Sequence, residues 1–400
     1  MKSKEYIQWT KNHHQSQEHD PIYSNFSREI IEQVKKFHQS HLAYTKTPLY
    51  SLQQLAKKLN VEQIYAKDES QRFGLNAFKV LGGVYAIAKY IADTLAIPFE
   101  NITFEDLKSE EVKNRLGQLT FITATDGNHG RGVAWAAREL GHQSIVYMPK
   151  GSSQQRLEAI RAEGADAHIL SLNYDDCVRE CAKLAETNGY IVIQDTAWDG
   201  YEDIPLWIMQ GYATIGLEIV EELPTPPTHI FLQAGVGSFA AAITAFFYEL
   251  YPENPPKIII AEADQADCYY QSFLTRDASI QFVTGDMATI MAGLACGEPN
   301  KDAYRILRNK AFATFSCDDV ISALGMRIYG NPCSGDPAIV SGESGAVTLG
   351  LLYYLQKFQL EIAKVLELNE RSCVLLISTE GDTDLEQYEK VTWLGHFPKL

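Results

Sequence analysis

Residues 229–250 read HIFLQAGVGSFAAAITAFFYEL, and this stretch decides the fold class. It starts as a short apolar run of the kind found in buried strands, and it ends as an apolar segment with helical spacing. Gln233 and the glycines at 235 and 237 interrupt the apolar run near its start, so a membrane-spanning helix is not expected. The stretch therefore predicts a strand, a tight turn and a helix.

The same order of strand, loop and helix recurs along most of the chain. Short β-branched runs alternate with longer segments whose apolar residues repeat with a helical period. The expected strands cover residues 63–66, 119–124, 144–148, 168–172, 190–194, 229–233, 257–261 and 373–378. The expected helices cover residues 78–95, 130–140, 154–162, 174–187, 205–222, 239–250 and 345–358. This alternation predicts an α/β protein with parallel-type sheets covered by helices.

No repeat, low-complexity run or flexible linker marks a single domain boundary in the sequence. We expect two lobes, with residues 1–83 and 205–400 forming a large discontinuous domain and residues 84–204 forming a small one. In such sheets the ligand binds beyond the carboxyl ends of the strands, on loops that lead into helices. The active site is therefore expected between the two lobes.

Composition and charge exclude several classes of protein. The 400 residues include 35 basic and 51 acidic side chains, which gives a formal net charge of −16. A chain this acidic lacks the basic face that nucleic-acid binding requires. The hydrophobic share of 46% and the charged share of 22% are those of an ordinary globular protein. Residues 1–20 are polar and lack the apolar core of a secretory signal, so we expect a flexible tail and a cytoplasmic protein.

Cysteine and histidine patterns give no sign of a metal centre. The seven cysteines include no C-x-x-C pair, so free thiols are expected, and whether Cys268 and Cys296 are joined stays open. His13, His14 and His19 lie in the polar tail, and we assign them no metal.

Two loops near the middle of the first half carry reactive side chains. Lys79 stands at the expected start of a helix beside Phe78, where burial and the helix dipole depress the pKa of an amine. Such an amine forms Schiff bases readily, although a surface lysine is the alternative. Asp126 and Asn128 follow an apolar strand in a glycine-containing loop, where they offer a carboxylate and an amide to a ligand. The alternative is an Asp-Gly turn with Asn128 as a helix cap.

Two further loops complete the candidate site. The loop that contains Gly235, Val236, Gly237 and Ser238 presents successive amides at a helix N-terminus, as phosphate-binding loops do. It lacks both the third glycine of a dinucleotide fingerprint and the lysine of a P-loop, and a tight turn is the alternative. Near the end of the chain, Ser378 and Thr379 place hydroxyls where a heterocyclic nitrogen can meet them, or they form a simple polar turn.

One ligand uses all four loops, because pyridoxal 5'-phosphate has an aldehyde, a phosphate, a phenolic oxygen and a ring nitrogen. The motifs also resemble those of the tryptophan-synthase-β-like (fold type II) pyridoxal enzymes and, among them, the diaminopropionate ammonia-lyase family. The resemblance covers roughly residues 48–384. The motifs that carry it are residues 67–70, 72–79, 125–132, 194–198, 209–212, 285–294, 341–346 and 378–384.

The resemblance implies a role for each candidate residue. Lys79 would be the Schiff-base lysine and a catalytic base, and Phe78 would pack against the cofactor ring. Asn128 would meet the ring oxygen, and Thr379, or else Ser378, would meet the pyridine nitrogen. The phosphate would lie on Gly235, Val236, Gly237 and Ser238.

The resemblance also implies the reaction. It is the α,β-elimination of D- and L-2,3-diaminopropionate to pyruvate and two ammonia by a carbon–nitrogen lyase. Related serine and threonine dehydratases usually have a serine in place of Asp126, and we expect Asp126 to take the α proton of the D isomer. Asp195 would hold the distal amine, unless it is only a helix cap. The alternatives are a serine/threonine dehydratase-like lyase and a non-catalytic binder of the cofactor. Beyond this small amino-acid substrate we expect a homodimer by analogy, with no membrane or nucleic-acid partner.

Overall fold

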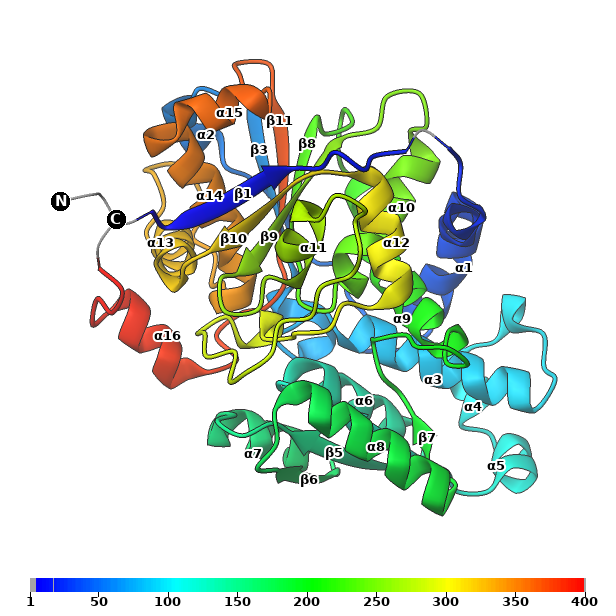
Figure 1. Cartoon of the computed structure of the whole chain (residues 1–400). Helices are drawn as coiled ribbons and strands as arrows, with labels where there is room; N and C mark the ends of the chain where they lie inside the picture. Colours follow the sequence, from blue (N-terminus) through cyan, green and yellow to red (C-terminus); the bar gives the residue numbers. More distant parts are fainter. Residues whose placement is uncertain (1–4, 17, 399–400) are drawn as a thin grey trace.

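The computed structural model describes residues 5–16 and 18–398, and it contains two β-sheets (Figure 1). The larger sheet has the strand order β1 (Ile7–Lys11), β10 (Ala311–Cys317), β9 (Lys257–Ala263), β8 (His229–Gln233), β11 (Cys373–Ser378), β3 (Gln63–Asp68) and β2 (Leu49–Ser51). The smaller sheet has the order β6 (Asp166–Ile169), β5 (Gln143–Met148), β4 (Thr120–Ala124) and β7 (Ile191–Val192). All pairings are parallel except those of the two edge strands of the larger sheet, β1 and β2.

Helices cover both faces of the larger sheet, because its central strands alternate their apolar side chains between two cores. Ile258 and Ile260 face one core, whereas Ile259 and Ala261 face the other. Among the helices that contribute buried residues to the first core are α1 (Arg28–Gln39), α3 (Val80–Thr94), α9 (Asp203–Val220), α10 (Ser238–Leu250), α11 (Cys268–Leu274) and α12 (Lys301–Lys310). Those of the second core are α2 (Gln53–Leu59), α13 (Asp319–Gly330), α14 (Glu343–Phe358), α15 (Leu360–Val365) and α16 (Leu385–Thr392).

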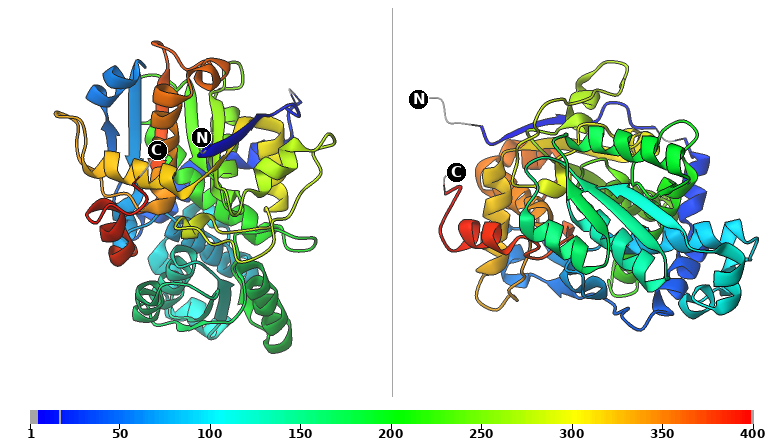
Figure 2. Two further views of the ribbon diagram at one scale, coloured as in Figure 1. Left: turned by 60° about the vertical axis from the view of Figure 1, so that its left-hand side comes forward. Right: turned by 90° about the horizontal axis from the view of Figure 1, so that it is seen from below.

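The smaller sheet has its own helical layers. Helix α8 (Tyr174–Asn188) packs on one face, and α6 (Asn128–Glu139) and α7 (Gln154–Ala162) pack on the other. The short helices α4 (Phe104–Leu107) and α5 (Glu110–Leu116) connect α3 to β4. The short 3-10 helices are η1 (Pro21–Phe26), η2 (Glu69–Gly74), η3 (Phe99–Asn101) and η4 (Ala292–Leu294). In the left view of Figure 2 the smaller sheet and its helices lie below the larger sheet.

Helix α3 lies between the two sheets because glycines let it approach its neighbours closely. A Cβ atom on Gly211 of α9 would come within 2.4 Å of the carbonyl oxygen of Leu81 in α3. A Cβ atom on Gly132 of α6 would come within 2.8 Å of the Cα atom of Val80. Helix α3 therefore packs on α9 and on α6 at the same time, and Lys79 at its start lies between the sheets.

The structure confirms the α/β class and the alternation of strands with helices, and it corrects the description of the N-terminal tail. Residues 1–4 lie outside the described residues, but Ile7–Lys11 form strand β1, which pairs antiparallel with β10. His14 lies at 3.1 Å from the carbonyl oxygen of Thr275. A polar segment can form such an edge strand because one of its sides needs no strand partner.

Several other features bear on the expectations from sequence. Strand β10 and helices α12 and α13 are among the elements that were not expected from the sequence. All seven cysteines are free thiols, including Cys268 and Cys296. Across residues 5–16 and 18–398, no helix has the length and apolar character needed to cross a bilayer, and no group of side chains forms a metal-ligand cluster.

Candidate active site

The four predicted loops meet in one cavity at the carboxyl ends of strands β8 and β11. Nine of the predicted site residues line this cavity: Phe78, Lys79, Asn128, Asp195, Gly235, Val236, Gly237, Ser238 and Thr379. Two do not. Asp126 lines a neighbouring cavity, and Ser378 points its hydroxyl to Ser341 Oγ at 2.8 Å, away from the cavity wall.

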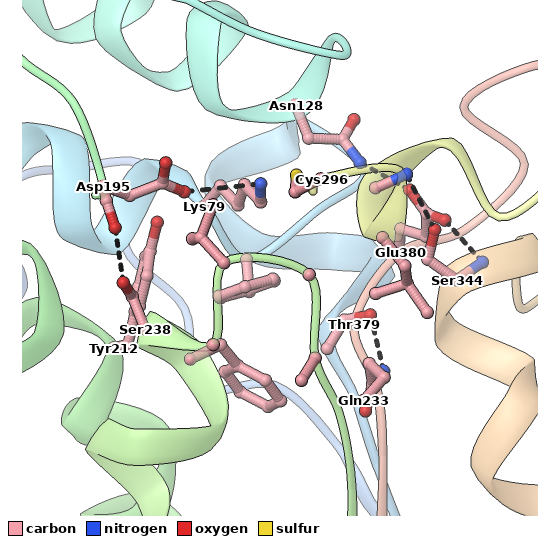
Figure 3. Close-up of a pocket in the computed structure, with 18 of the residues that line it drawn as sticks. Lys79, Asn128, Asp195, Tyr212, Gln233, Ser238, Cys296, Ser344, Thr379 and Glu380 are labelled. Carbon is pink, nitrogen blue, oxygen red and sulfur yellow. Dashed lines mark hydrogen bonds and ion pairs between the residues drawn. The ribbon is translucent and has the colours of Figure 1, made fainter. Parts of the chain in front are cut away.

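Lys79 lies between two carboxylates, of which Figure 3 shows that of Asp195. It forms the N-cap of α3, and its Nζ atom lies 3.5 Å from Asp195 Oδ2 and 3.7 Å from Asp126 Oδ1. Burial lowers the pKa of Lys79, but the charges of Asp195 and Asp126 outweigh burial and raise that pKa above its usual value. The prediction that the pKa of Lys79 is lowered is therefore wrong. The sequence did not show that both carboxylates face the Lys79 amine.

Asp195 is fixed by neighbours that donate hydrogen bonds to it. It follows strand β7, and its Oδ1 atom accepts from the Tyr174 hydroxyl at 3.3 Å and from Gln194 Nε2 at 3.4 Å. Burial would raise the pKa of Asp195, but the Lys79 ammonium and the other polar neighbours lower it below its usual value. Asp195 is therefore an ionised carboxylate that points at the Lys79 amine.

Asp126 has a different environment from Asp195. The turn that carries it is held by Thr125, whose Oγ1 atom accepts from the N–H groups of Gly127 at 2.8 Å and Gly130 at 3.0 Å. Asp126 Oδ2 has no hydrogen-bond partner in the described part of the chain, and the guanidinium of Arg156 comes no nearer than 4.0 Å. One oxygen of Asp126 therefore faces Lys79, while the other is free to bind a ligand.

The side chain of His129 is buried in the same turn, and its Nε2 atom lies 2.8 Å from the carbonyl oxygen of Ile193. His129 thus ties the start of α6 to the segment that leads to Asp195, and Thr125 supports the turn. Asn128 also has a partner that was not expected, because its Nδ2 atom donates to Glu380 Oε2 (Figure 3). One hydrogen of the Asn128 amide remains available to a ligand.

The glycine loop between β8 and α10 forms a site for an anion. The first N–H groups of α10 lack partners within the helix and point out of its N-terminus. Gly237 has a φ of +93°, and a Cβ atom there would come within 2.0 Å of the Tyr269 hydroxyl. That hydroxyl donates to the carbonyl oxygen of Val236 at 2.8 Å, and the Ser238 hydroxyl donates to the carbonyl oxygen of Asp195. The hydroxyls of Tyr269 and Ser238 thus hold the loop, and its two glycines carry no side chain that would cover the N-terminus of α10.

Further residues of the cavity had no predicted role. Tyr212 packs edge-on against the predicted residue Phe78 at 4.7 Å between ring centroids, and the ring of Phe239 lies at the same distance from Phe78. Tyr212 and Glu380 belong to motifs that are visible in the sequence, whereas Cys296 and Tyr174 reach the wall only through the fold. Burial raises the pKa of the Cys296 thiol well above its usual value, so this thiol is neutral.

A second cavity of 730 Å³ lies beside the first, and Tyr174 lines both. Its wall contains Asp126, Arg156 and Glu343. Arg156 Nη2 lies 3.7 Å from Glu343 Oε2, and Arg156 Nε and Glu343 Oε1 have no hydrogen-bond partner in the described chain. Burial raises the pKa of Glu343 to about 8, although Arg156 opposes this effect. The second cavity therefore brings further polar groups up to Asp126.

Comparison with known proteins gives consistent results. The family described as pyridoxal-phosphate dependent enzyme matches residues 41–375. The diaminopropionate ammonia-lyase of Salmonella typhimurium is 50% identical over 374 residues, which cover 92% of each chain. The crystal structure of selenomethionine-containing holo diaminopropionate ammonia lyase from Escherichia coli has a TM-score of 0.91 at 46% identity, covering 98% of this chain and 97% of that chain. The E. coli enzyme in complex with an aminoacrylate-PLP azomethine reaction intermediate has a TM-score of 0.89 at 46% identity, covering 98% of both chains.

Proposed function

Because this chain belongs to the family of pyridoxal-phosphate dependent enzymes and, within it, to the diaminopropionate ammonia-lyases, we propose that it catalyses the α,β-elimination of 2,3-diaminopropionate. The enzyme is a carbon–nitrogen lyase, since the bond to the β amine breaks. The observation that carries this proposal is the position of the Lys79 amine, which lies between two carboxylates and beside an anion-binding loop.

The cofactor is pyridoxal 5'-phosphate, and the side chains of the first cavity fit it. When bound, this group supplies an aldehyde for amines and a ring that withdraws electrons from the substrate's α carbon. A Cβ atom on Gly235 would come within 3.0 Å of the carbonyl oxygen of Gly293, so a side chain there would require the neighbouring backbone to shift. The residues that would hold the cofactor are Phe78, Lys79, Asn128, Gly235, Val236, Gly237, Ser238 and Thr379.

Lys79 acts as a base in this proposal. A lysine that exchanges its place at the aldehyde carbon with the substrate amine is left as a free amine beside the α carbon. The two neighbouring carboxylates keep the protonated form of this amine stable, so Lys79 can accept the α proton of the L isomer and hold it.

Asp126 is the base for the D isomer, whose α hydrogen points to the opposite face. Its Oδ1 atom is 3.7 Å from Lys79 Nζ, and its Oδ2 atom has no protein partner in the described chain. Two bases on separate residues can therefore serve the two isomers without a rearrangement of the site. A serine at this position could not take a proton as well as a carboxylate does, because its conjugate acid is far too strong.

Asp195 supports the departure of the β amine. Its ionised carboxylate attracts the distal ammonium of the substrate and orients it for elimination. Loss of the α proton and of ammonia leaves an enamine acid, and water converts the released enamine to pyruvate and a second ammonia. One substrate and one water thus yield one pyruvate and two ammonia.

A substrate panel tests the proposed function against its alternatives. Purified holoenzyme is incubated with D- and L-diaminopropionate, serine and threonine, and pyruvate or 2-oxobutyrate is measured together with ammonia. We expect pyruvate with two equivalents of ammonia from both isomers of diaminopropionate. Product from serine and threonine alone would instead indicate a dehydratase, and a cofactor spectrum without turnover would indicate a binding protein.

Three further features belong to the proposal. We infer that residues 1–83 and 205–400 form the large domain and residues 84–204 the small one, which is supported by the separation of the two sheets. We also infer a cytoplasmic homodimer, as is usual for enzymes of this fold. Light scattering of the purified holoenzyme at several concentrations would measure the mass of the assembly.

A further inference from the structure

Gln233 is a buried residue of the first cavity that has no role in the reaction described above. It is the last residue of β8, and Thr379 directly follows β11, the neighbouring parallel strand. Both side chains are almost completely buried. Figure 3 shows the Gln233 amide joined to the Thr379 hydroxyl by a hydrogen bond. Gln233 is therefore in direct contact with the hydroxyl that would meet the ring nitrogen of the cofactor.

The two partners of the Gln233 amide fix its orientation. Its Nε2 atom donates to the carbonyl oxygen of Ile377 at 3.1 Å and to Thr379 Oγ1 at 2.8 Å. A peptide carbonyl only accepts hydrogen bonds, so the opposite orientation would set two acceptors against each other. The amide keeps this orientation even though Gln233 Oε1 is buried and finds no partner among the residues that the structure describes.

This orientation makes the Thr379 oxygen an acceptor toward Gln233. A hydroxyl has a single hydrogen, so an oxygen that accepts from one neighbour must direct its hydrogen to another. Within the described part of the chain, Thr379 Oγ1 accepts a hydrogen bond from Gln233 and donates none. The hydrogen of the Thr379 hydroxyl is therefore left for a ligand.

We propose that Gln233 is a positioning residue that turns the hydrogen of the Thr379 hydroxyl toward the cofactor, so that the ring nitrogen accepts it and carries no proton. This inference rests on the proposed function, because it requires the ring nitrogen to lie at Thr379. A ring nitrogen without a proton withdraws electrons less strongly than a pyridinium does. Gln233 thereby favours elimination of the β amine over protonation of the cofactor's carbonyl carbon, which would lead to transamination.

The test measures the protonation of the ring nitrogen directly. Holoenzyme is prepared with pyridoxal phosphate that carries ¹⁵N in the ring, and its chemical shift is compared with reference compounds in both protonation states. In Gln233→Glu, a carboxyl can be protonated toward the Ile377 carbonyl and accept the Thr379 hydrogen on its other oxygen. Gln233→Met removes the donor and keeps the length of the side chain, so it serves if Gln233→Glu fails to fold or to retain the cofactor.

The matched control is Gln210→Met. Gln210 is also a buried glutamine that donates to a carbonyl, that of Asn25 at 3.0 Å, but it does not line the cavity. We expect wild type and Gln210→Met to show an unprotonated ring nitrogen, and both Gln233 variants to shift toward the protonated value. Pyridoxamine phosphate formed per turnover should rise about tenfold in Gln233→Glu, the factor that one hydrogen bond of ordinary strength controls.

Thr379→Val separates failure of this inference from failure of the residue assignment. A wild-type shift in both Gln233 variants, with a changed shift in Thr379→Val, would overturn the role of Gln233 and leave Thr379 at the ring nitrogen. An unchanged shift in Thr379→Val as well would remove Thr379 from the ring nitrogen and overturn both assignments, while the substrate panel would still decide the lyase activity. A protonated ring in wild type would also overturn the inference.

Discussion

Arg72 and Lys79 each lie in a cluster of charged side chains, but only the Arg72 cluster is completely buried and saturated with short hydrogen bonds. Arg72 Nη1 lies 2.7 Å from Glu218 Oε1, and Arg72 Nε lies 2.8 Å from Glu69 Oε2. Lys67 Nζ completes the first cluster at 2.7 Å from Glu218 Oε2. The side chains of all four residues are 0% exposed.

The cluster around Lys79 is loose by comparison. Its ion-pair distances are 3.5 Å to Asp195 and 3.7 Å to Asp126, and Arg156 lies 4.0 Å from Asp126 and 3.7 Å from Glu343. Asp126, Arg156 and Glu343 each have a polar atom without a partner in the described chain.

The difference shows which buried charges hold the fold and which are available for chemistry. A buried charge is costly unless hydrogen bonds satisfy it, so a saturated cluster is part of the structure. In a cluster with unpaired polar atoms, hydrogen bonds do not offset the free-energy cost of burial. Those atoms remain able to bind substrate or cofactor. The side chain of Lys67 is completely buried and that of Lys79 is 15% exposed, and on this basis only Lys79 is reactive.

The largest expected effect is the loss of activity in Lys79→Ala. Removal of both the covalent anchor and a base should lower pyruvate formation from L-diaminopropionate by about 10⁴-fold or more. Lys79→Ala also leaves Asp126 and Asp195 without their ammonium partner, so the melting temperature of the protein should fall, but the long ion-pair distances of 3.5 and 3.7 Å limit the decrease. Activity within 100-fold of wild type would place the reactive amine elsewhere.

The next largest effect breaks the saturated cluster. Glu218→Gln leaves the Arg72 and Lys67 charges poorly compensated in the interior and should lower the free energy of unfolding by about 3–5 kcal/mol. Urea denaturation measures this change. The matched control is Glu361→Gln, which removes an exposed ion pair with Lys364 and should cost less than about 0.5 kcal/mol. Equal effects of the two substitutions would remove the distinction between a saturated buried cluster and a surface pair.

Asp126→Asn should affect the turnover of the two isomers of diaminopropionate to different extents. We expect turnover of D-diaminopropionate to fall about 10²- to 10³-fold, because its base is lost, while turnover of the L isomer falls by less than about tenfold. Steady-state assays of pyruvate with each isomer measure the ratio. Equal losses for D and L would contradict the assignment of one base to each isomer.

A glutamate of each cluster has a shifted pKa, and the two shifts have opposite directions: the pKa of Glu218 is lowered and that of Glu343 is raised. Burial would raise the pKa of Glu218, but Arg72 and Lys67 outweigh it and lower this pKa to about 2. Its contribution to stability is therefore full above the unfolded pKa of about 4.5 and is lost as the pH falls toward 2. The pKa of Glu343 is raised to about 8, so the folded state binds its proton more tightly and stability decreases as the pH rises from about 4.5 to 8.

Urea denaturation at several pH values tests this contrast. Glu343→Gln should flatten the decline toward pH 8, by an amount on the order of 2 kcal/mol. Glu218→Gln should flatten the loss of stability in acid instead. If Glu343→Gln left the alkaline side of the profile unchanged, Glu343 would be ionised and would form a stronger ion pair with Arg156 than the 3.7 Å distance indicates.

The smallest effect concerns the support of Asp195. Tyr174→Phe removes one hydrogen bond of 3.3 Å to the carboxylate and should reduce kcat/KM for diaminopropionate about 3- to 10-fold. Tyr353→Phe is the control, because Tyr353 packs against the second core of the larger sheet, whereas Tyr174 belongs to the core of the smaller sheet. A loss of more than 100-fold in Tyr174→Phe would instead give its hydroxyl a direct part in the reaction.

The reactive loops could be predicted from sequence because each one joins a short apolar strand to a helix. Lys79, Asn128 and the 235–238 loop all have such flanking elements, and the fold brings them into one cavity. The saturated cluster could not be found this way, since Arg72 and Glu218 are separated by 146 residues and only the packing of α9 joins them. The same holds for Glu380 and Asn128, which are 252 residues apart.

Edge strands were also beyond prediction from local pattern. Residues 7–11 alternate too briefly to distinguish a strand from a polar tail, and pairing with β10 decides their structure. The prediction of a lowered pKa for Lys79 was wrong for a related reason. Burial and the helix dipole are visible in the sequence near Lys79, but the approach of Asp195 from the end of β7 is a property of the fold.

Covalent trapping distinguishes the reactive Lys79 from the structural Lys67. The holoenzyme is reduced with borohydride, which fixes an adduct between a lysine and the cofactor aldehyde, and its peptides are mapped by mass spectrometry. We expect one label, on Lys79, with Lys67 unmodified. A label on Lys67 or on another lysine, with Lys79 free, would contradict this assignment.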